Sequence, residues 1–383
     1  MRRILIFSLF YYHRRVAGAE VAVKEITDRI SEEEFEFHMI ALNGGGEKSV
    51  EKVGTVTVHR IFKGPGIIQK LLYPFVAYSK AVELHKVHHF DTLWAIMASY
   101  AGFAALLFKR KFPHVPSLLT IQEGEHFELR AGVLKPVFCK IFQSADYLQV
   151  ISKFLAEWAE KMGARGPIVV VPNAVDIELF APQHGKVEMS KNKALQDLKI
   201  KLGKKPGDTF LITTSRLSEK NAIGDIISAL SYLSPTISLL ILGQGQLETT
   251  LKMQVATLLL EHRVRFLGYV AHADMPHYLH VSDIFIRPSL TEGLGNSFLE
   301  AMAAEIPVIA TPVGGIPDFL IDGETGLFCE VKNPRSIAQK VEKLIKDPES
   351  YSYIVKRAGA MVREKYQWSH ISDDMAKIFR MLS

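Results

Sequence analysis

Short apolar runs alternate with amphipathic stretches along almost the whole chain, and this alternation constrains the fold more than any other feature. The apolar runs in the first half are RILIFSLF, FEFHMIAL, TLWAIMAS, PSLLTIQ, YLQVIS and IVVVPN, and those in the second half are TFLITTS, ISLLILG, VRFLGYV, IFIRPS and PVIAT. Between them lie segments such as AEVAVKEITDRI, DIISALSYL and SFLEAMAA, whose apolar residues follow the helical period of about 3.6 residues. Alternating strands and helices build parallel sheets that are covered by helices on both faces. We therefore expect an α/β protein.

The alternation is interrupted once, by a stretch that is rich in lysine and poor in large apolar residues, APQHGKVEMSKNKALQDLKIKLGKKPGD (181–208). We interpret this stretch as linker-like. At 383 residues, the chain is also too long for a single core of about 150 residues. We expect a first domain over 1–185, a linker over 186–207, a second domain over 208–365 and a final amphipathic helix over 366–383. In doubly wound domains, ligands bind at the carboxyl ends of the strands.

The cysteines and the apolar segments indicate the compartment. Cys139 and Cys329 lie far apart and form no CxxC pair, so we expect neither a disulfide framework nor a zinc site, and a reducing cytoplasm fits best. The start, MRRILIFSLFYYHRR, imitates a signal peptide, but its apolar run is short and we interpret it as a buried strand. The uncharged segment 92–108 fits a strand plus a helix better than a membrane span. We expect no transmembrane segment.

The positive charge is concentrated early in the chain. Between Arg60 and Pro113 there are eight Lys or Arg residues and two Asp or Glu residues, whereas the whole chain carries a net charge of +5. Such a region fits an anionic partner such as a membrane surface, although a solvated face is the commoner cause. Its apolar residues would then dock on lipid beside the lysines; they are Ile67, Ile68, Leu71, Leu72 and Phe75. The alternative, which we favour slightly at this point, is a helix pair that packs on the first sheet with a break at Pro74. Nothing in the sequence indicates a nucleic acid partner, and it leaves the oligomeric state open.

Two features in the second half place charges and glycines where strands end. Arg216 and Lys220 lie four residues apart after the run TFLITTS, and two fixed cations at a strand end suit a diphosphate. Taken alone, a surface pair on a loop is the commoner interpretation. Gly243 and Gly245 end the run ISLLILG and let the backbone approach a ligand closely, although a lone GxG is a weak signal.

The segment TEGLGNSFLE places Glu292 and Glu300 at the two ends of a glycine-rich turn. One explanation is a capping box, in which Ser297 caps a helix and Glu300 reaches back to the Ser297 N–H group. That explanation leaves Glu292 without a role. The turn residues 293–296 also offer N–H groups at a helix N-terminus, which suits phosphate or sugar oxygens. A further glycine pair, in ATPVGGIPDFL, follows the next strand.

The segment TEGLGNSFLEAMAAEIPVIATPVGGIPDFLIDGETGLF closely resembles the donor site of glycosyltransferase family 4, which comprises retaining enzymes of the GT-B fold. SRLSEKN resembles the family's diphosphate-binding Arg and Lys, and RVAGAEVAV resembles its first glycine turn. VISKFLAEWAEKMG and VVVPNAVDIELF look like its passage out of the first domain. The resemblance covers nearly the whole chain except residues 60–90. It implies two Rossmann-like doubly wound domains that face each other across a cleft, with the C-terminal helix crossing back to the first domain.

The resemblance also implies a role for each matching residue. Glu300 would bind the ribose of a nucleoside-diphosphate sugar, and Glu292 would bind the hydroxyls of the donor sugar. Arg216 and Lys220 would hold the diphosphate, because cations stabilise the charge on the leaving group. The remaining donor contacts would come from Gly18, Gly243, Tyr269, Gly293, Leu294, Gly295 and Asn296. The carboxylates suit their task because they accept hydrogen bonds from hydroxyl groups.

The implied reaction is the retaining transfer of a hexose from a UDP- or GDP-sugar to a hydroxyl of a glycan or lipid-linked acceptor, in the synthesis of cell-surface polysaccharide or glycolipid. We expect no cofactor and no metal, because there is no DxD motif and the fourteen histidines show no zinc-like spacing. We expect the enzyme in the cytoplasm, with the inner face of the plasma membrane as a peripheral location.

Two positions depart from the family pattern. Gln122 stands where many members carry histidine, and because Gln does not titrate we expect it to hydrogen-bond a donor hydroxyl rather than to act as an acid or base. Glu123, Glu125 and His126 are nearby substitutes for that role. Asn221 stands where glycine is common, and asparagine also tolerates left-handed backbone.

Two other classes of protein remain as alternatives. One is a nucleotide-sugar-modifying enzyme on the same scaffold, such as an epimerase. The other is a non-catalytic protein that binds a nucleotide sugar or a glycan. A dehydrogenase-like module would need G-x-G-x-x-G after the first strand, which this chain lacks.

Overall fold

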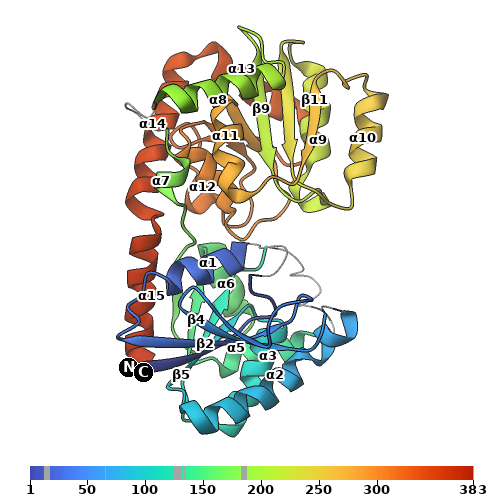
Figure 1. The fold of residues 1–383 in the computed structure, drawn as a ribbon. Coiled ribbons are helices and arrows are strands. Elements are labelled where there is room, and N and C mark those ends of the chain that lie inside the picture. The colour runs from blue at the N-terminus through green and yellow to red at the C-terminus, as the bar shows by residue number, and fades with distance from the viewer. Residues whose placement is uncertain (13–17, 65, 125–131, 133, 183–187, 383) are drawn as a thin grey trace. The chain divides into compact units, whose positions relative to one another are not determined.

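The computed structural model describes residues 1–12, 18–64, 66–124, 132, 134–182 and 188–382. The chain divides into two compact units (Figure 1): unit 1 comprises Met1–Ala174 and Trp368–Ser383, and unit 2 comprises Val175–Gln367. Each unit has its own sheet, so the expectation of two α/β domains is confirmed. No helix in the described part of the chain is both long enough and apolar enough to cross a membrane.

Unit 1 is built on an eight-stranded sheet with the order β3-β4-β2-β1-β5-β6-β7-β8. All neighbouring strands are parallel except β3 and β4, which are antiparallel. The strands are β1 (Arg2–Phe7), β2 (Phe35–Leu42), β3 (Val50–Val53), β4 (Val56–Ile61), β5 (Thr92–Ile96), β6 (Ser117–Ile121), β7 (Tyr147–Val150) and β8 (Ile168–Val170). The order of the strands reverses between β1 and β5, which makes that point the switch point of the first sheet.

The helices of unit 1 are α1 (Gly18–Thr27), α2 (Ile67–His88), α3 (Tyr100–Lys111), α5 (Lys135–Ser144), α6 (Lys153–Lys161) and α15 (Trp368–Leu382). Helix α2 packs against α3, but it runs through Pro74 without interruption, so the expected break is wrong. A proline in a helix removes one backbone hydrogen bond, and tertiary packing must compensate. Here Tyr73 is fully buried, and its hydroxyl lies 2.9 Å from the Ser8 carbonyl and 2.8 Å from that of Ile40.

The last helix, α15, completes the core of unit 1. Phe379 is fully buried, and its ring centroid lies 5.1 Å from that of Trp94 and 5.9 Å from those of Phe35 and Phe37. The next residue, Arg380, donates two hydrogen bonds to the Glu34 carboxylate, at 2.7 and 2.8 Å. The two chain ends consequently lie close together in unit 1 (Figure 1).

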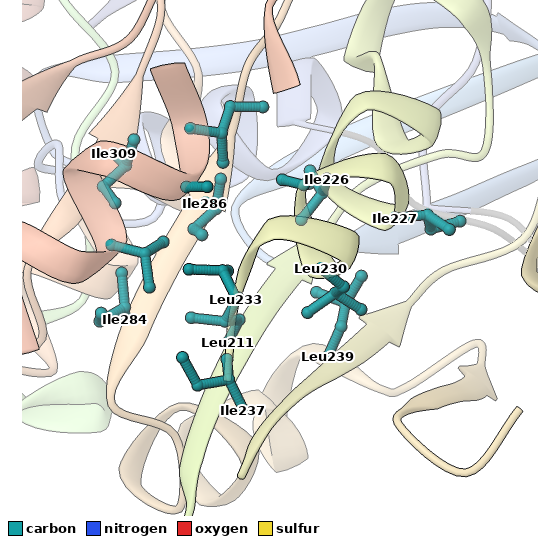
Figure 2. Close-up of a cluster of buried hydrophobic side chains, with 14 of the residues drawn as sticks. Leu211, Ile226, Ile227, Leu230, Leu233, Ile237, Leu239, Ile284, Ile286 and Ile309 are labelled. Carbon is teal, nitrogen blue, oxygen red and sulfur yellow. The ribbon is translucent and has the colours of Figure 1, made fainter. Parts of the chain in front are cut away.

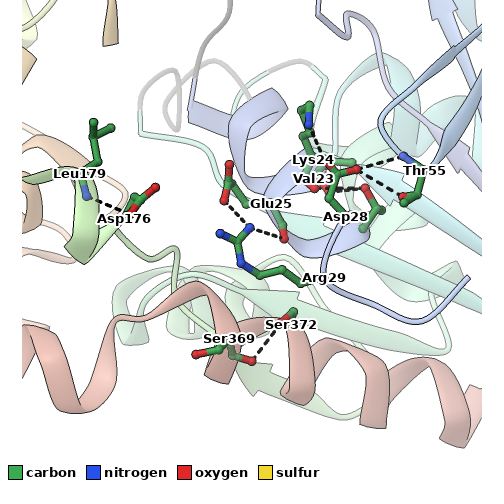
Figure 3. Close-up of polar contacts among 11 residues, drawn as sticks. Val23, Lys24, Glu25, Asp28, Arg29, Thr55, Asp176, Leu179, Ser369 and Ser372 are labelled. Carbon is green, nitrogen blue, oxygen red and sulfur yellow. Dashed lines mark hydrogen bonds and ion pairs between the residues drawn. The ribbon is translucent and has the colours of Figure 1, made fainter. Parts of the chain in front are cut away.

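Local polar contacts fix several of these elements (Figure 3). Asp28 at the end of α1 accepts a hydrogen bond of 2.9 Å from the Thr55 N–H group, so it ties α1 to the turn between β3 and β4. Lys24, one turn earlier, forms an ion pair with the same carboxylate. In unit 2, Asp176 caps the short helix α7 (Ile177–Phe180) by accepting from the Leu179 N–H group at 3.1 Å.

Unit 2 is built on a six-stranded parallel sheet with the order β11-β10-β9-β12-β13-β14. The strands are β9 (Thr209–Thr214), β10 (Ile237–Leu242), β11 (Val264–Gly268), β12 (Ile284–Arg287), β13 (Val308–Ala310) and β14 (Leu327–Phe328). The helices besides α7 are α8 (Glu188–Lys201), α9 (Ile223–Ala229), α10 (Glu248–Thr257), α11 (Met275–His280), α12 (Asn296–Ala303), α13 (Pro334–Lys346) and α14 (Pro348–Lys365). Short 3-10 helices are η1 (Glu219–Asn221), η2 (Leu230–Tyr232), η3 (His272–Asp274) and η4 (Ile316–Asp318).

Unit 2 begins at Val175, and the lysine-rich stretch 186–207, interpreted above as a linker, contains α8 and lies inside this unit. One core cluster of unit 2 is largely aliphatic (Figure 2). Leu211 and Leu239 from the sheet pack with Ile226 and Leu230 from the segment that follows η1. Burial of each such side chain contributes about 1.5–3 kcal/mol, so this layer fixes where the carboxyl ends of the strands lie.

Candidate functional site in unit 2

The loops that leave β9 and β12 meet at the switch point of the second sheet. The strand order reverses between these two strands, and ligands of doubly wound sheets bind in the crevice outside such a point. Arg216 and Lys220 follow β9, and residues 288–295, which we call the donor loop, connect β12 to α12. The Leu290 N–H group donates to the Lys220 carbonyl oxygen at 2.6 Å, so the two loops are directly joined.

Glu292 lies at the centre of this site and is only 8% exposed. Its Oε2 atom forms an ion pair with Arg287, and its Oε1 atom accepts from the Gly293 N–H group at 3.0 Å. Lys220 Nζ lies 3.9 Å from the same Oε1 atom. A carboxylate has about four acceptor positions, so Glu292 can accept further hydrogen bonds from ligand hydroxyls while it keeps these contacts.

Arg287, the last residue of β12, is a site residue that the sequence interpretation missed. It is 6% exposed and donates to the Ser297 hydroxyl at 2.6 Å and to the Ser289 hydroxyl at 3.2 Å. Its guanidinium also lies 4.4 Å from the centroid of the Phe298 ring. The available signal was a charged residue at the end of the otherwise apolar run IFIRPS. Arg287 fixes both the strand end and the start of α12 around Glu292.

Glu300 lies on α12, and its Oε1 atom is 3.1 Å from Nε2 of His272 in η3. The capping-box explanation is wrong, because α12 begins after Gly295 without any side-chain cap. The Ser297 hydroxyl that would have served as the cap accepts from Arg287 instead. Tyr269, in the loop after β11, is 67% exposed.

Two glycines allow backbone segments to pack closely around the site. Gly243 has φ +136°, and a Cβ atom there would lie 1.9 Å from the Ser215 carbonyl oxygen. Gly314 has φ +57°, and a Cβ atom there would lie 1.9 Å from the Glu292 carbonyl oxygen. The N–H group of the following residue, Gly315, donates to that same Glu292 carbonyl at 3.1 Å. The loop after β13 therefore supports the donor loop from behind.

The expectation for Asn221 is wrong in one respect. The residue with left-handed backbone is Ala222, at φ 48°. Asn221 is 2% exposed, and its side-chain amide donates to the Arg216 carbonyl at 2.7 Å and to the Ser218 hydroxyl at 3.3 Å. The side chain thus holds the loop that carries Arg216 and Lys220, which glycine could not do.

The remaining predicted residues belong to unit 1. Gln122 follows β6, and its Oε1 atom accepts from the Asn173 side chain at 3.1 Å. Glu123 is buried and accepts from the N–H groups of Ala98 at 2.9 Å and Gln122 at 3.1 Å, so this carboxylate holds backbone and is a poor substitute for the usual histidine. Glu125 and His126 lie outside the described residues. Gly18 is the exposed first residue of α1.

In the described part of the chain, the one group of three potential metal ligands does not include Glu292 or Glu300. What unit 2 does contain is a buried carboxylate between two cations, with glycine turns around it. Such a site can hold an anionic ligand that also presents hydroxyl groups.

Two family models match the chain. One, described as glycosyl transferases group 1, matches residues 196–361, and the other, described as glycosyltransferase family 4, matches residues 16–179. Each match falls largely within one unit of the structure.

Curated proteins are similar to this chain over almost its whole length. The chain is 25% identical over 377 residues to N-acetyl-alpha-D-glucosaminyl L-malate synthase of Bacillus anthracis, with 95% of this chain and 94% of the relative covered. It is 28% identical over 252 residues to a GDP-mannose-dependent monoacylated alpha-(1-6)-phosphatidylinositol monomannoside mannosyltransferase of Corynebacterium glutamicum, with 63% and 64% covered.

Solved structures agree with the fold. Sucrose-phosphate synthase from Thermosynechococcus elongatus superimposes with a TM-score of 0.85 at 18% identity, covering 100% of this chain and 99% of that one. Anabaena HepE in complex with UDP-glucose superimposes with a TM-score of 0.81 at 19% identity, covering all of both chains. The protein thus has the GT-B fold, and it belongs to glycosyltransferase family 4.

Proposed function

We propose that the protein is a retaining hexosyltransferase that moves a hexose from a UDP- or GDP-linked donor to a hydroxyl of a glycan or lipid-linked acceptor. The pathway we propose is the synthesis of cell-surface polysaccharide or glycolipid on the cytoplasmic side of the membrane. Family membership supports the transferase, and the names of similar proteins support the donor class. The C. glutamicum relative is named as GDP-mannose-dependent, and HepE was solved with UDP-glucose.

The proposal depends above all on one observation: the cation of Lys220 lies 3.9 Å from the buried carboxylate of Glu292 at the switch point of the sheet. A nucleotide sugar presents a negative diphosphate next to sugar hydroxyls. Lys220 suits the first of these groups and Glu292 the second, because a carboxylate accepts from hydroxyls and an ammonium group donates to phosphate.

In the proposed reaction, the bond between the anomeric carbon and the diphosphate breaks, and negative charge develops on the leaving group. Lys220 stabilises that charge from its position beside Glu292, and Arg216 adds a second cation from the same loop. Because Asn221 and Leu290 hold the backbone of this loop, little reorganisation is needed during the reaction. The departing phosphate takes the proton of the acceptor hydroxyl, which attacks from the same face. No protein nucleophile is assigned, and the two cations take the place of a metal ion.

The other contacts orient the donor. Glu292 accepts from the sugar hydroxyls near the reacting carbon, and Glu300 accepts from the ribose in place of its contact with His272. The N–H groups of residues 293–296 hold sugar or phosphate oxygens, and the loop after β11 with Tyr269 contacts the base. From unit 1, Gly18 contacts the phosphates and Gln122 hydrogen-bonds a donor hydroxyl.

A donor screen followed by turnover tests the function. UDP-, GDP- and ADP-sugars are first ranked by thermal shift, because a ligand that binds the folded state raises its apparent stability. The best donor is then assayed with Glu292→Gln, Lys220→Ala and the control Lys252→Ala, an exposed lysine on α10 that pairs with Glu248. We expect at least a hundredfold loss of kcat/KM in the first two variants, on the order of the loss of a fixed transition-state contact, and no change in the control. Equal activity in all four proteins would refute the proposed site.

The products separate the competing classes. A retaining transferase yields the same anomeric configuration as the donor, which NMR of the product reads directly. Donor that is isomerised without any acceptor would indicate the epimerase alternative, and tight binding without turnover would indicate a binding protein. Unchanged turnover after chelator treatment supports a reaction without a metal.

We further propose that the N-terminal part of α2 docks on an anionic bilayer. Five apolar side chains of this helix are exposed and recur at spacings that place them on one face, with Ile67 at 77% and Leu71 at 59% exposure; the five are Ile67, Ile68, Leu71, Leu72 and Phe75. Lys63 and Lys70 lie in the same segment. Apolar side chains on one face with adjacent basic residues are typical of an interfacial helix.

Vesicle co-sedimentation tests the membrane surface. We expect binding to vesicles that contain phosphatidylserine or phosphatidylglycerol at low salt, and weaker binding to neutral phosphatidylcholine vesicles. Ile68→Ser combined with Leu71→Ser should release the protein, whereas Met381→Ser, an equally exposed apolar residue on α15, should not. Absence of binding to anionic vesicles would rule the surface out without affecting the donor site.

A further inference from the structure

Two histidines and a glutamate in unit 1 form a cluster that the proposed reaction does not use. Glu36 and His38 lie two residues apart on β2 and therefore point to the same face of the sheet. His88 is the last residue of α2. One potential ligand atom from each of the three side chains lies within 4.8 Å of the other two.

The orientation of His38 is fixed on both sides of its ring. Nε2 lies 2.8 Å from Glu36 Oε1, and Nδ1 lies 3.1 Å from Nε2 of His59 on β4. The ring of His88 lies beside that of His38, with 4.2 Å between centroids. Histidines that bind metal ions usually hydrogen-bond an outer partner through the second ring nitrogen, and His59 occupies that position here.

Arg3 on β1 holds the other two members. Its Nε donates to Glu36 Oε2 at 3.0 Å, and its Nη1 donates to the His88 carbonyl at 2.9 Å. Because Arg3 holds Oε2 of Glu36, the other carboxylate oxygen, Oε1, faces His38. The His38 side chain is 4% exposed and that of Glu36 is 31% exposed, so the cluster is rigid at its base and reachable from solvent.

We propose that Glu36, His38 and His88 bind a divalent transition metal ion, with Zn²⁺ as the best match. Two imidazole nitrogens and one carboxylate oxygen are ligands that suit Zn²⁺ and its neighbours in the first transition row, whereas Mg²⁺ and Ca²⁺ prefer sites made of oxygen atoms alone. The ion lies between Glu36 Oε1 and His38 Nε2 in place of their contact at 2.8 Å, and water completes its coordination. Because the guanidinium of Arg3 repels a cation, we expect a lower affinity than that of a four-ligand structural site.

Such an ion would join the end of α2 to β2. Helix α2 is 22 residues long, and the face proposed to dock on lipid lies at its other end. The metal would therefore stabilise the packing of α2 on β2 and would take no part in the transfer reaction. The competing interpretation is a network of hydrogen bonds among the same side chains that holds no ion.

The test uses the full chain with any affinity tag removed and with metal stripped by a chelator. Zn²⁺ is titrated into this protein by isothermal calorimetry, and Co²⁺ is followed by its visible absorption, which reports nitrogen and oxygen ligands directly. We expect one equivalent of Zn²⁺ per chain and a rise in melting temperature when it binds. His88→Ala should weaken binding by at least about tenfold, since the loss of even an outer contact costs about 10–100-fold.

Two controls separate a built site from general binding. His89→Asn alters the neighbouring exposed histidine, and asparagine tolerates its left-handed backbone at φ 51°, so Zn²⁺ affinity should be unchanged. His88 is only partly buried, and circular dichroism of His88→Ala confirms folding before the titration. No zinc bound by the wild type, equal affinity in His88→Ala, or an equal loss in His89→Asn would each overturn the proposal.

Discussion

Replacement of Arg287 should both destabilise unit 2 and reduce activity, because this side chain neutralises Glu292 and also fixes its position. Methionine is close to arginine in length but provides neither the charge nor the hydrogen bonds. Arg287→Met leaves Glu292 with the Gly293 N–H group and with Lys220 at 3.9 Å. Removal of one partner of a buried pair costs about 3–5 kcal/mol, and we expect the lower end because Lys220 remains.

That free energy translates into a measurable shift. For a domain of 150–250 residues, each kcal/mol lowers the melting temperature by about 2–4 °C, so Arg287→Met should lower the transition of unit 2 by about 6–12 °C. At a temperature well below this transition, kcat/KM should fall by about a hundredfold, since a displacement of about 1 Å at a reacting site costs that much. Calorimetry and steady-state kinetics with the best donor measure the two effects.

A double mutant separates the cost of leaving the Glu292 carboxylate unpaired from the cost of losing the other contacts of Arg287. Arg287→Met combined with Glu292→Gln removes the unpaired carboxylate, so most of the lost stability should return. Arg287→Lys keeps the charge, but lysine cannot reach all the partners of Arg287 at once. Its melting temperature and kcat/KM should therefore lie between those of the wild type and those of Arg287→Met. If Arg287→Met melts within 1 °C of the wild type and turns over normally, or if the double mutant is no more stable than the single one, the reasoning is wrong.

Three further predictions concern other parts of the chain. Phe379→Ala should lower the melting temperature of unit 1 by about 10 °C, since removal of a fully buried phenylalanine costs about 3–5 kcal/mol. A native-state assay with a thiol reagent should label Cys139 alone, because burial raises the pKa of Cys329 to about 12, and both thiols should react after unfolding. Gly314→Ala should reduce turnover by at least about tenfold, because its Cβ atom would overlap the donor loop. Gly323→Ala is the control: its Cβ atom meets no other atom, so this variant should keep its turnover and lose only a little stability.

Each of these predictions has a result that contradicts it. A transition of Phe379→Ala that coincides with that of the wild type would mean that α15 does not complete the core. Rapid labelling of two thiols in the native protein would show that Cys329 is accessible. Equal turnover in Gly314→Ala and Gly323→Ala would show that the loop after β13 does not support the donor loop.

Most of the strands that the sequence predicted correctly are buried, and the edge strands β8 and β11 were predicted as well because their sequences are also apolar runs. Parallel central strands such as β1 and β10 are continuous apolar runs, and that pattern is visible without any structure. The pair β3 and β4 was missed because VEKVGTVTVHRI mixes polar and apolar residues. Of these two, only β3 is an edge strand, and β4 lies between β3 and β2 and is largely buried, so pairing and not local apolar content decides the structure here.

Helix α8 is a second element that local composition failed to predict. Its sequence, EMSKNKALQDLKIK, has few apolar residues, so composition indicated a linker. Helix formers such as Lys, Leu, Ala and Gln nevertheless support a helix when one side contacts a neighbour. That neighbour is α11, which is more than seventy positions away in the chain and is not visible from local composition.

Residues of the candidate site could be singled out from the sequence by residue type and position, but their contacts could not be predicted where they depend on how a loop folds back. Lys220 and Glu292 could be singled out by their residue type and their position after a strand. Arg287 also stands at a strand end, but its role was not predictable, because that role depends on a donor loop that returns Glu292 to the strand end five residues later. The shift of left-handed backbone from Asn221 to Ala222 is likewise a property of the turn as a whole.

The placement of α15 in unit 1 affects the order in which the protein can fold during synthesis. The chain enters unit 2 at Val175 and leaves it at Gln367, and these two residues pair with each other as a parallel bridge. The ribosome therefore produces all of unit 2 before Phe379, which the aromatic core of unit 1 needs. Domains commonly fold as they emerge, in order from the N-terminus. Here the later unit can finish first, while the aromatic residues of the earlier unit that contact Phe379 lack this partner until α15 has been made.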